Sequence, residues 1–281
     1  MATARSDCLA CGRAGVIAPA TSALLRCPGC GLGWAREWPS EPEVRALYDN
    51  GYFRGGEYLD YVAARRAWQR TFRRYLARLE RFSPGGALLE VGCAHGFFLE
   101  LARARWRVTG IDINAEACAQ AAHLPGVEVR CGELLELPLA RASYDAACLW
   151  ATLEHLRAPD ATLARIGELV RPGGIVALTT GDLGSLLARL RGSRWRQIHP
   201  PTHLFYFTRP SLQRLLERAG FALIHADHPG TDRCLDEVVY TLCVTRHGRP
   251  DLYRRLARLG LTRGSFYLNL FDTLFVVGRR R

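Results

Sequence analysis

From residue 87 onward, short apolar runs alternate with segments whose apolar residues recur about every 3.6 positions. The apolar runs predict seven strands, at residues 87–91, 107–111, 127–131, 145–150, 175–180, 221–227 and 274–278. The segments of helical periodicity predict helices at residues 96–105, 115–122, 160–170 and 208–219. Strands that alternate with helices predict an α/β fold with a doubly wound, mostly parallel, seven-stranded sheet over residues 85–281.

Three segments do not follow this alternation. Residues 181–207 and 229–270 are predicted to be insertions around an active site. Residues 41–84 read as a helical lid or linker, with the clearest helical period over 57–82. An aromatic cluster crowds this segment, and such residues are usually core, although beside a ligand site they could form a lid. The cluster comprises Tyr48, Tyr52, Phe53, Tyr58 and Tyr61.

Two Cys-x-x-Cys pairs lie within the first 40 residues. They are Cys8 with Cys11 and Cys27 with Cys30. Four thiolates at two such turns match a closed tetrahedral Zn²⁺ site, which has no open position for catalysis. We therefore expect residues 1–40 to form a small zinc ribbon that serves folding or docking. The alternative is a set of unrelated buried thiols.

Composition places the chain among globular proteins. The 281 residues are 48% apolar and 23% charged, and the net charge is +11, with every cation an arginine. This charge favours anionic partners such as phosphates or nucleic acid, although arginines on solvated helix faces explain it equally. The sequence has neither an apolar run of about 20 residues nor a signal-peptide core. With ten cysteines, which indicate metal ligation and buried thiols rather than disulfides, we expect a cytoplasmic protein without membrane segments.

A nucleotide-binding turn is predicted between the first strand and its helix. Glu90-x-Gly92-x-x-x-Gly96 lets the backbone approach a ligand closely. Asp112 ends the next strand, where an acid can accept hydrogen bonds from both ribose hydroxyls. These features fit a dinucleotide or another adenosine cofactor.

Further motifs distinguish between these cofactors. Glu133 follows the third strand, Trp150 ends the fourth and precedes Glu154-His155, and a Leu-Val-Arg-Pro-Gly-Gly run at 169–174 precedes the fifth. In this order the series resembles class I S-adenosylmethionine-dependent methyltransferases over roughly residues 85–280. With the zinc ribbon and Tyr48-x-x-x-Tyr52-Phe53, it is similar to the zinc-ribbon methyltransferases of bacterial saccharide and natural-product gene clusters.

The resemblance implies a cofactor site. Gly92, Ala94 and Gly96 would approach the amino-acid part of S-adenosylmethionine. Glu90 would orient that turn or meet the ammonium group. Asp112 would hold the ribose hydroxyls, Glu133 and the backbone of Leu134 would meet the adenine edge, and Trp150 would lie beside the sulfonium. Ile113 is a further expected cofactor contact. The family usually has glycine where this chain has Ala94, and alanine is tolerable there if its φ is negative.

Methylation of a hydroxyl needs a base, and histidine is the natural candidate near neutral pH. We expect His203 to be this base, with His155 second. For His155, we give a role in helix capping or packing the same weight as the role of a base. The resembled family lines its substrate pocket with similar segments, so substrate contacts are predicted at Tyr58, Tyr61, His199 and Tyr206.

The sequence thus predicts O-methylation of a small acceptor, such as a sugar, a nucleotide-sugar or a natural-product hydroxyl. N- or C-methylation of a small metabolite is an alternative. Another is an RNA base methyltransferase that docks RNA on the ribbon, although no Asn-Pro-Pro-Tyr type motif follows the fourth strand. A third alternative is a non-catalytic partner protein that binds the cofactor. The oligomeric state is not predicted.

Overall fold

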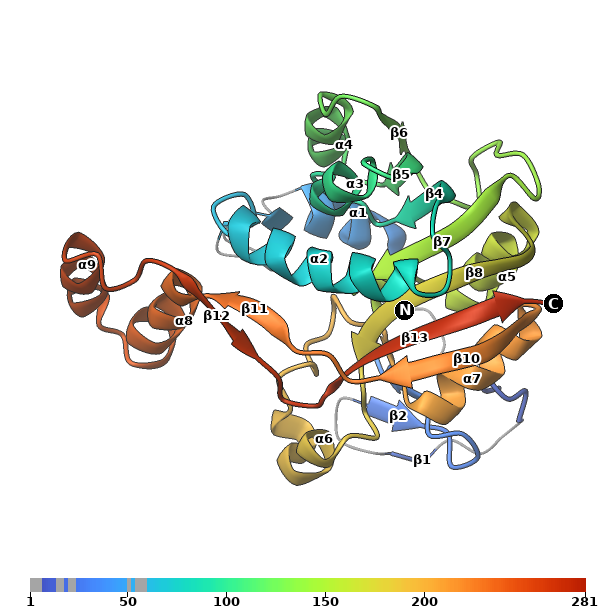
Figure 1. The fold of residues 1–281 in the computed structure, drawn as a ribbon. Coiled ribbons are helices and arrows are strands. Elements are labelled where there is room, and N and C mark those ends of the chain that lie inside the picture. The colour runs from blue at the N-terminus through green and yellow to red at the C-terminus, as the bar shows by residue number, and fades with distance from the viewer. Residues whose placement is uncertain (1–6, 14–17, 20–23, 50–51, 54–59) are drawn as a thin grey trace.

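A seven-stranded sheet forms the centre of the molecule, as the sequence predicts (Figure 1). The computed structural model describes residues 7–13, 18–19, 24–49, 52–53 and 60–281. The strands run in the order β10-β13-β8-β7-β4-β5-β6. Neighbours from β8 to β6 are parallel, whereas β13 is antiparallel to both β8 and β10. The strands are β4 (Gly86–Val91), β5 (Trp106–Asp112), β6 (Val127–Cys131), β7 (Tyr144–Trp150), β8 (Val170–Gly181), β10 (Phe221–Asp227) and β13 (Thr273–Arg280).

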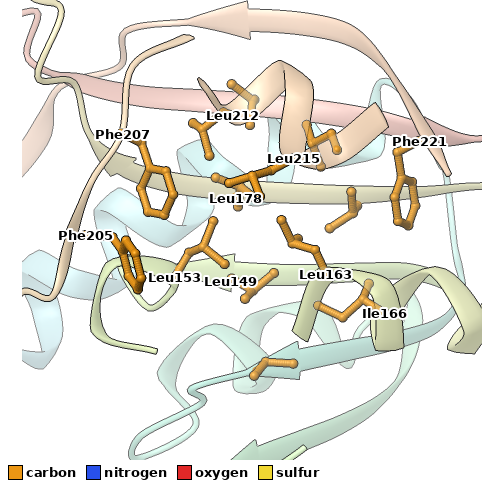
Figure 2. Packing of buried hydrophobic residues seen from close by; sticks show 14 of the residues in the cluster. Leu149, Leu153, Leu163, Ile166, Leu178, Phe205, Phe207, Leu212, Leu215 and Phe221 are labelled. Atoms are coloured by element: carbon orange, nitrogen blue, oxygen red, sulfur yellow. The ribbon is translucent and has the colours of Figure 1, made fainter. Parts of the chain in front are cut away.

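Helices cover both faces of this sheet. On one face, α2 (Arg65–Glu80) and α3 (Phe97–Ala102) pack on a cluster that is rich in aromatic residues. On the other face, α5 (Pro159–Leu169) and α7 (Arg209–Arg218) bury leucines against β7 and β8, as Figure 2 shows. The helix α4 (Ala115–Ala122) lies against β5 and β6. The two apolar faces explain why the strands read as continuous apolar runs.

The N-terminal ribbon is joined to the main domain through a shared sheet. Its strands are β1 (Ala18–Pro19), β2 (Leu24–Arg26) and β3 (Gly33–Ala35). The fourth strand, β9 (Phe205–Tyr206), comes from the segment predicted as the first insertion, and it pairs antiparallel with β3. The domain boundary at residue 40 stays a prediction, but the ribbon does not form its sheet alone.

Several elements differ from the predicted bounds. The lid segment contains α1 (Glu41–Asp49), and the long helix expected from residue 57 begins at Arg65. Asp60 accepts a hydrogen bond from the backbone N–H of Ala63 at 2.8 Å, so its side chain stabilises a turn ahead of the helix. The Arg-Pro-Gly-Gly run at 171–174, expected to precede the fifth strand, lies instead inside β8, which starts at Val170 opposite Tyr144.

The second predicted insertion forms an arm that projects from the sheet (Figure 1). Its base is the antiparallel pair β11 (Thr231–Cys234) and β12 (Ser265–Leu268). Asp232 fixes this base to α2, because its N–H donates to the Thr71 hydroxyl at 2.7 Å. The tip contains α8 (Leu235–Tyr240), a π-helical turn at 241–246 and α9 (Pro250–Arg258), none of which has a buried residue. The first insertion carries α6 (Leu186–Arg191). Within the described ranges, no helix has the length and apolarity to cross a bilayer.

Candidate active site

A cavity of about 220 Å³ opens at the carboxyl ends of β4, β5 and β7. In open α/β sheets, this edge is where ligands bind. We call it the central cavity. From the strand ends it is lined by Val91, Gly92, Ala94, Ile111, Asp112, Ile113, Trp150, Ala151 and Thr152. The remaining lining residues are Val44, Tyr48, Tyr52, Phe53, Tyr61, Gly132, Glu133, Leu134, Leu135, His155, Leu156, Arg157, Ala158 and Thr162.

The turn after β4 is tightly constrained. Gly92 has φ +79°, and a Cβ atom there would lie 2.4 Å from the Thr152 hydroxyl, so only glycine fits. Gly96, also left-handed at φ +74°, precedes α3. Ala94 has φ +46°, so the condition of a negative φ, under which alanine would be well tolerated here, is not met. Its N–H donates to Asp112 Oδ2 at 2.7 Å, a bond that helps hold the strained conformation.

Asp112 joins this turn to the end of β5. Its Oδ2 accepts from Ala94, and its Oδ1 accepts from the N–H of Asn114 at 2.9 Å. Burial raises the pKa of Asp112, and the backbone N–H groups oppose that shift. Each carboxylate oxygen has a second lone pair. An acid fixed in this way on the cavity wall suits the recognition of a pair of hydroxyl groups.

Glu90 is a buried acid directly below the turn. Only 2% of its surface is exposed, and its Oε2 has no hydrogen-bond partner among the described residues. Burial, and secondarily the nearby Asp112, raise the pKa of Glu90 well above its usual range. Glu90 does not line the central cavity. Its carboxyl group fits a nearby ammonium or guanidinium group, which would favour the charged form.

Aromatic side chains make one wall of the central cavity. The Tyr48 and Tyr52 ring centroids lie 4.6 Å apart, and Phe53 lies 5.2 Å from Tyr61. These residues come from α1 and from the chain just before α2, so the predicted lid segment does reach the site. The expected substrate contact Tyr58 lies outside the described residues.

The far end of the central cavity combines apolar and acidic groups. Ile113 and Leu134 line it together with the exposed Glu133. Trp150 also lines the central cavity, while its ring stacks on Phe275 at 5.8 Å. Of the nine residues predicted to bind the cofactor, seven line the central cavity, whereas Glu90 and Gly96 do not. The nine are Glu90, Gly92, Ala94, Gly96, Asp112, Ile113, Glu133, Leu134 and Trp150.

The three histidines cluster, but only His155 lines the central cavity. His155 Nδ1 lies 2.9 Å from the carbonyl oxygen of Thr202, and burial lowers the pKa of His155 to about 4. The ring of His203 lies behind, 4.6 Å from His155 and 3.7 Å from His199. Burial lowers the pKa of His203 far below its usual range.

Two predicted substrate contacts are found beside or within this histidine cluster instead of in the cavity wall. Neither His199 nor Tyr206 is in the described lining of the central cavity. Tyr206 donates its hydroxyl to the His203 carbonyl at 3.0 Å, and it belongs to β9 of the ribbon sheet. Likewise, no residue of 181–207 or 229–270 is found in that lining, so the expectation that these insertions surround the site stays a prediction.

The four ribbon cysteines converge. Their sulfur atoms all lie within 4.8 Å of one another, with Cys8 to Cys30 at 3.5 Å and Cys11 to Cys27 at 3.6 Å. Sulfur atoms at ~2.3 Å from a tetrahedral zinc ion lie roughly 3.8 Å apart, so the arrangement fits this metal. Cys8 and Cys30 are also buried. The sequence expectation of a four-cysteine site is therefore supported by geometry.

Sequence reasoning missed two residues that shape the site. Thr152 covers the turn at Gly92, and no motif marks it. Arg157 lines the central cavity and donates to the carbonyl of Pro39 at 2.7 Å, which ties the ribbon to the chain after β7. Its guanidinium also stacks over Trp38 at 5.8 Å. Because this contact joins distant parts of the chain, no local signal reveals it.

Comparison of the sequence with known proteins identifies methyltransferases as its relatives. The sequence profile described as "Methyltransferase domain" matches residues 63–226, more than half of the chain. A probable S-adenosylmethionine-dependent methyltransferase of Mycolicibacterium smegmatis is 31% identical over 163 residues, which cover 57% of this chain and 61% of that protein. A ubiquinone biosynthesis O-methyltransferase of Alkalilimnicola ehrlichii is 32% identical over 154 residues, 52% of this chain and 55% of that protein. The matches thus span less than two thirds of these curated relatives.

Solved structures agree at the level of the fold. The [4+2]-cyclase SpnF superposes with a TM-score of 0.53 at 21% identity, covering 76% of this chain and 82% of the cyclase. A possible histamine N-methyltransferase of Thermotoga maritima gives a TM-score of 0.51 at 18% identity, covering 76% of this chain and 91% of that one.

Proposed function

This chain belongs to the methyltransferase domain family, and we propose that it transfers a methyl group from S-adenosylmethionine to a hydroxyl group of a small-molecule acceptor. The observation that carries the proposal is the Asp112 carboxylate, held by two backbone N–H groups on the wall of the central cavity. S-adenosylmethionine supplies an electrophilic methyl group on a sulfonium. The name of the relative from Alkalilimnicola ehrlichii, a ubiquinone biosynthesis O-methyltransferase, supports the choice of an oxygen acceptor.

The proposal assigns the residues of the turn to the cofactor. Asp112 would accept hydrogen bonds from the ribose hydroxyls, because each oxygen keeps a lone pair after binding the backbone. Glu90 would meet the ammonium group, whose charge would lower the raised pKa of this buried acid. Ile113 and Leu134 would cover the adenine, with Glu133 at its edge.

The acceptor would lie between the aromatic wall and His155. Tyr48, Tyr52, Phe53 and Tyr61 would limit its size and suit a sugar ring or a natural-product scaffold. His155 is the imidazole that reaches this space, so we place the acceptor hydroxyl beside it. His203 would support His155 from behind rather than contact the acceptor, which changes the role expected from the sequence.

Calorimetry on Asp112→Asn tests the cofactor assignment. Losing the charge but keeping the shape should weaken S-adenosylmethionine binding by about 1–3 kcal/mol, the cost of poorly paired hydrogen bonds to a buried group. Asp251→Asn in the exposed arm is the matched control and should bind as the wild type does. Tighter binding of a nicotinamide dinucleotide than of S-adenosylmethionine to the wild type would contradict the proposal.

A further inference from the structure

Three potential metal ligands meet beside the central cavity, and of these only His155 lines it. Glu154 and His155 follow β7, and His203 comes from the segment before β9. One ligand atom from each of the three lies within 4.8 Å of the others. Glu154 and His203 are 3% and 6% exposed. A hydrogen bond from the N–H of Leu204 to the carbonyl of Glu154, at 2.9 Å, fixes the two segments together.

The hydrogen bonds of the two imidazoles define which nitrogen is available. His155 Nδ1 lies 2.9 Å from the Thr202 carbonyl oxygen, and His203 Nδ1 lies 2.9 Å from that of Gln197. A carbonyl oxygen only accepts, so each Nδ1 carries the proton and donates it. Each Nε2 therefore presents a lone pair. This N–H to backbone carbonyl arrangement is the one that orients histidines on metal ions.

We propose that Glu154, His155 and His203 bind a divalent transition metal ion, with Zn²⁺ the fitting example, at the wall of the central cavity. Two imidazoles and one carboxylate favour zinc or iron over magnesium or calcium, which prefer sets made only of oxygen. Donor atoms at ~2.1 Å from a metal lie about 3.4–4.2 Å apart, so a closure of roughly 1 Å completes the site.

The position of the site indicates its use. Three protein ligands leave an open coordination position, as catalytic metal sites do. Because His155 lines the central cavity, that position faces the space assigned to the acceptor. An oxygen of the acceptor would be the fourth ligand, which would orient its hydroxyl, lower the pKa of that hydroxyl and favour transfer of its proton to solvent water. This use of the metal rests on the proposed function, whereas binding of the metal does not.

Metal content of the full-length chain tests the proposal. We would dialyse the reduced wild type against Zn²⁺, remove excess ion and measure zinc per chain. Two ions are expected, one at the four cysteines and one at this second site. Glu154→Gln and His203→Ala should each retain one, because losing a ligand should weaken the second site by at least ~100-fold. Cys27→Ser should lose the other ion, and the exposed His123→Gln control should keep both.

The outcomes separate the two proposals. Glu154→Gln preserves shape, so its thermal melting curve shows whether loss of the ion reflects unfolding. A folded wild type with one ion, unchanged in Glu154→Gln and His203→Ala, would overturn the second site. Calorimetry with S-adenosylmethionine on the same preparations tests the proposed function independently, because none of the three metal ligands is among the residues that we assign to the cofactor.

Discussion

Ala94 carries the clearest local strain near the site. An alanine at φ +46° costs about 1–2 kcal/mol relative to a right-handed conformation, and glycine avoids that cost. Ala94→Gly should therefore raise the free energy of unfolding by about 0.5–1 kcal/mol, after the extra freedom of glycine in the unfolded chain is subtracted. Urea denaturation measures this. Ala119→Gly, exposed within α4, is the control and should lose about 1 kcal/mol. Equal losses at both residues would contradict the strain at Ala94.

Glu90 should make the cofactor-free protein less stable as the pH rises. Its folded-state pKa is raised well above 4.5, so above pH 4.5 the folded chain keeps a proton that the unfolded chain releases. Stability then falls with rising pH, up to the raised pKa. Glu90→Gln removes this term, so its melting temperature should exceed that of the wild type at pH 8.

Melting curves from pH 4 to pH 9 without cofactor check the sign of this effect. The two proteins should converge near pH 4, where Glu90 is protonated in both states. The exposed Glu116→Gln in α4 serves as the control and should not change the slope. A constant offset between wild type and Glu90→Gln across the range would mean that packing, not ionisation, explains the difference.

At the scale of elements, the ribbon and the chain around β9 should lose structure together. Thr208 donates its hydroxyl to the carbonyl of Cys30 at 2.9 Å, and Ala35 donates to Leu204 at 2.8 Å. We expect Cys27→Ser, or chelation, to release the amide protons of residues 205–206 at least ~10-fold faster, because local opening sets their exchange. Hydrogen-exchange mass spectrometry measures this, with β5 as the internal reference.

Cys131→Ser, exposed on β6, is the matched control for this experiment and should leave exchange unchanged. The seven-stranded sheet should stay protected in every variant. If residues 205–206 kept their protection after metal loss, β9 would be held by the main domain alone.

Local signals in the sequence were sufficient to predict the seven strands of the central sheet and the turn at Gly92. Apolar runs buried on both faces mark the strands, and acids or glycines at their ends mark the cavity. The pairing of β3 with β9 left no such signal, because both are very short strands far apart in the chain. For the same reason the position of His203 was not predictable: the ribbon packs against its segment and holds it behind His155.

At the scale of the whole molecule, the arm should be dispensable for cofactor binding. Cys234 pairs with Ser265, and Leu235 donates to the Gly264 carbonyl at 3.0 Å, so a two-residue Asn-Gly turn can replace residues 236–263. The shortened chain should bind S-adenosylmethionine within about twofold of wild type. Affinity is lost only when a contact to the ligand is removed, and no described residue of the arm lines the central cavity. Calorimetry tests this, and a loss beyond ~10-fold would show that the arm supports the central cavity.

The contact between Thr208 and Cys30 joins residues 178 positions apart, which affects how the protein is made. A ribosome adds roughly 5–20 residues per second, so Cys30 is synthesised about 10–35 s before Thr208. During that interval the ribbon has no β9 to pair with, and Trp34, 3% exposed in the folded chain, lacks its cover. A bound metal would hold the nascent ribbon compact while it waits. Zinc supply during synthesis would therefore govern the yield of folded protein more strongly than zinc supply afterwards.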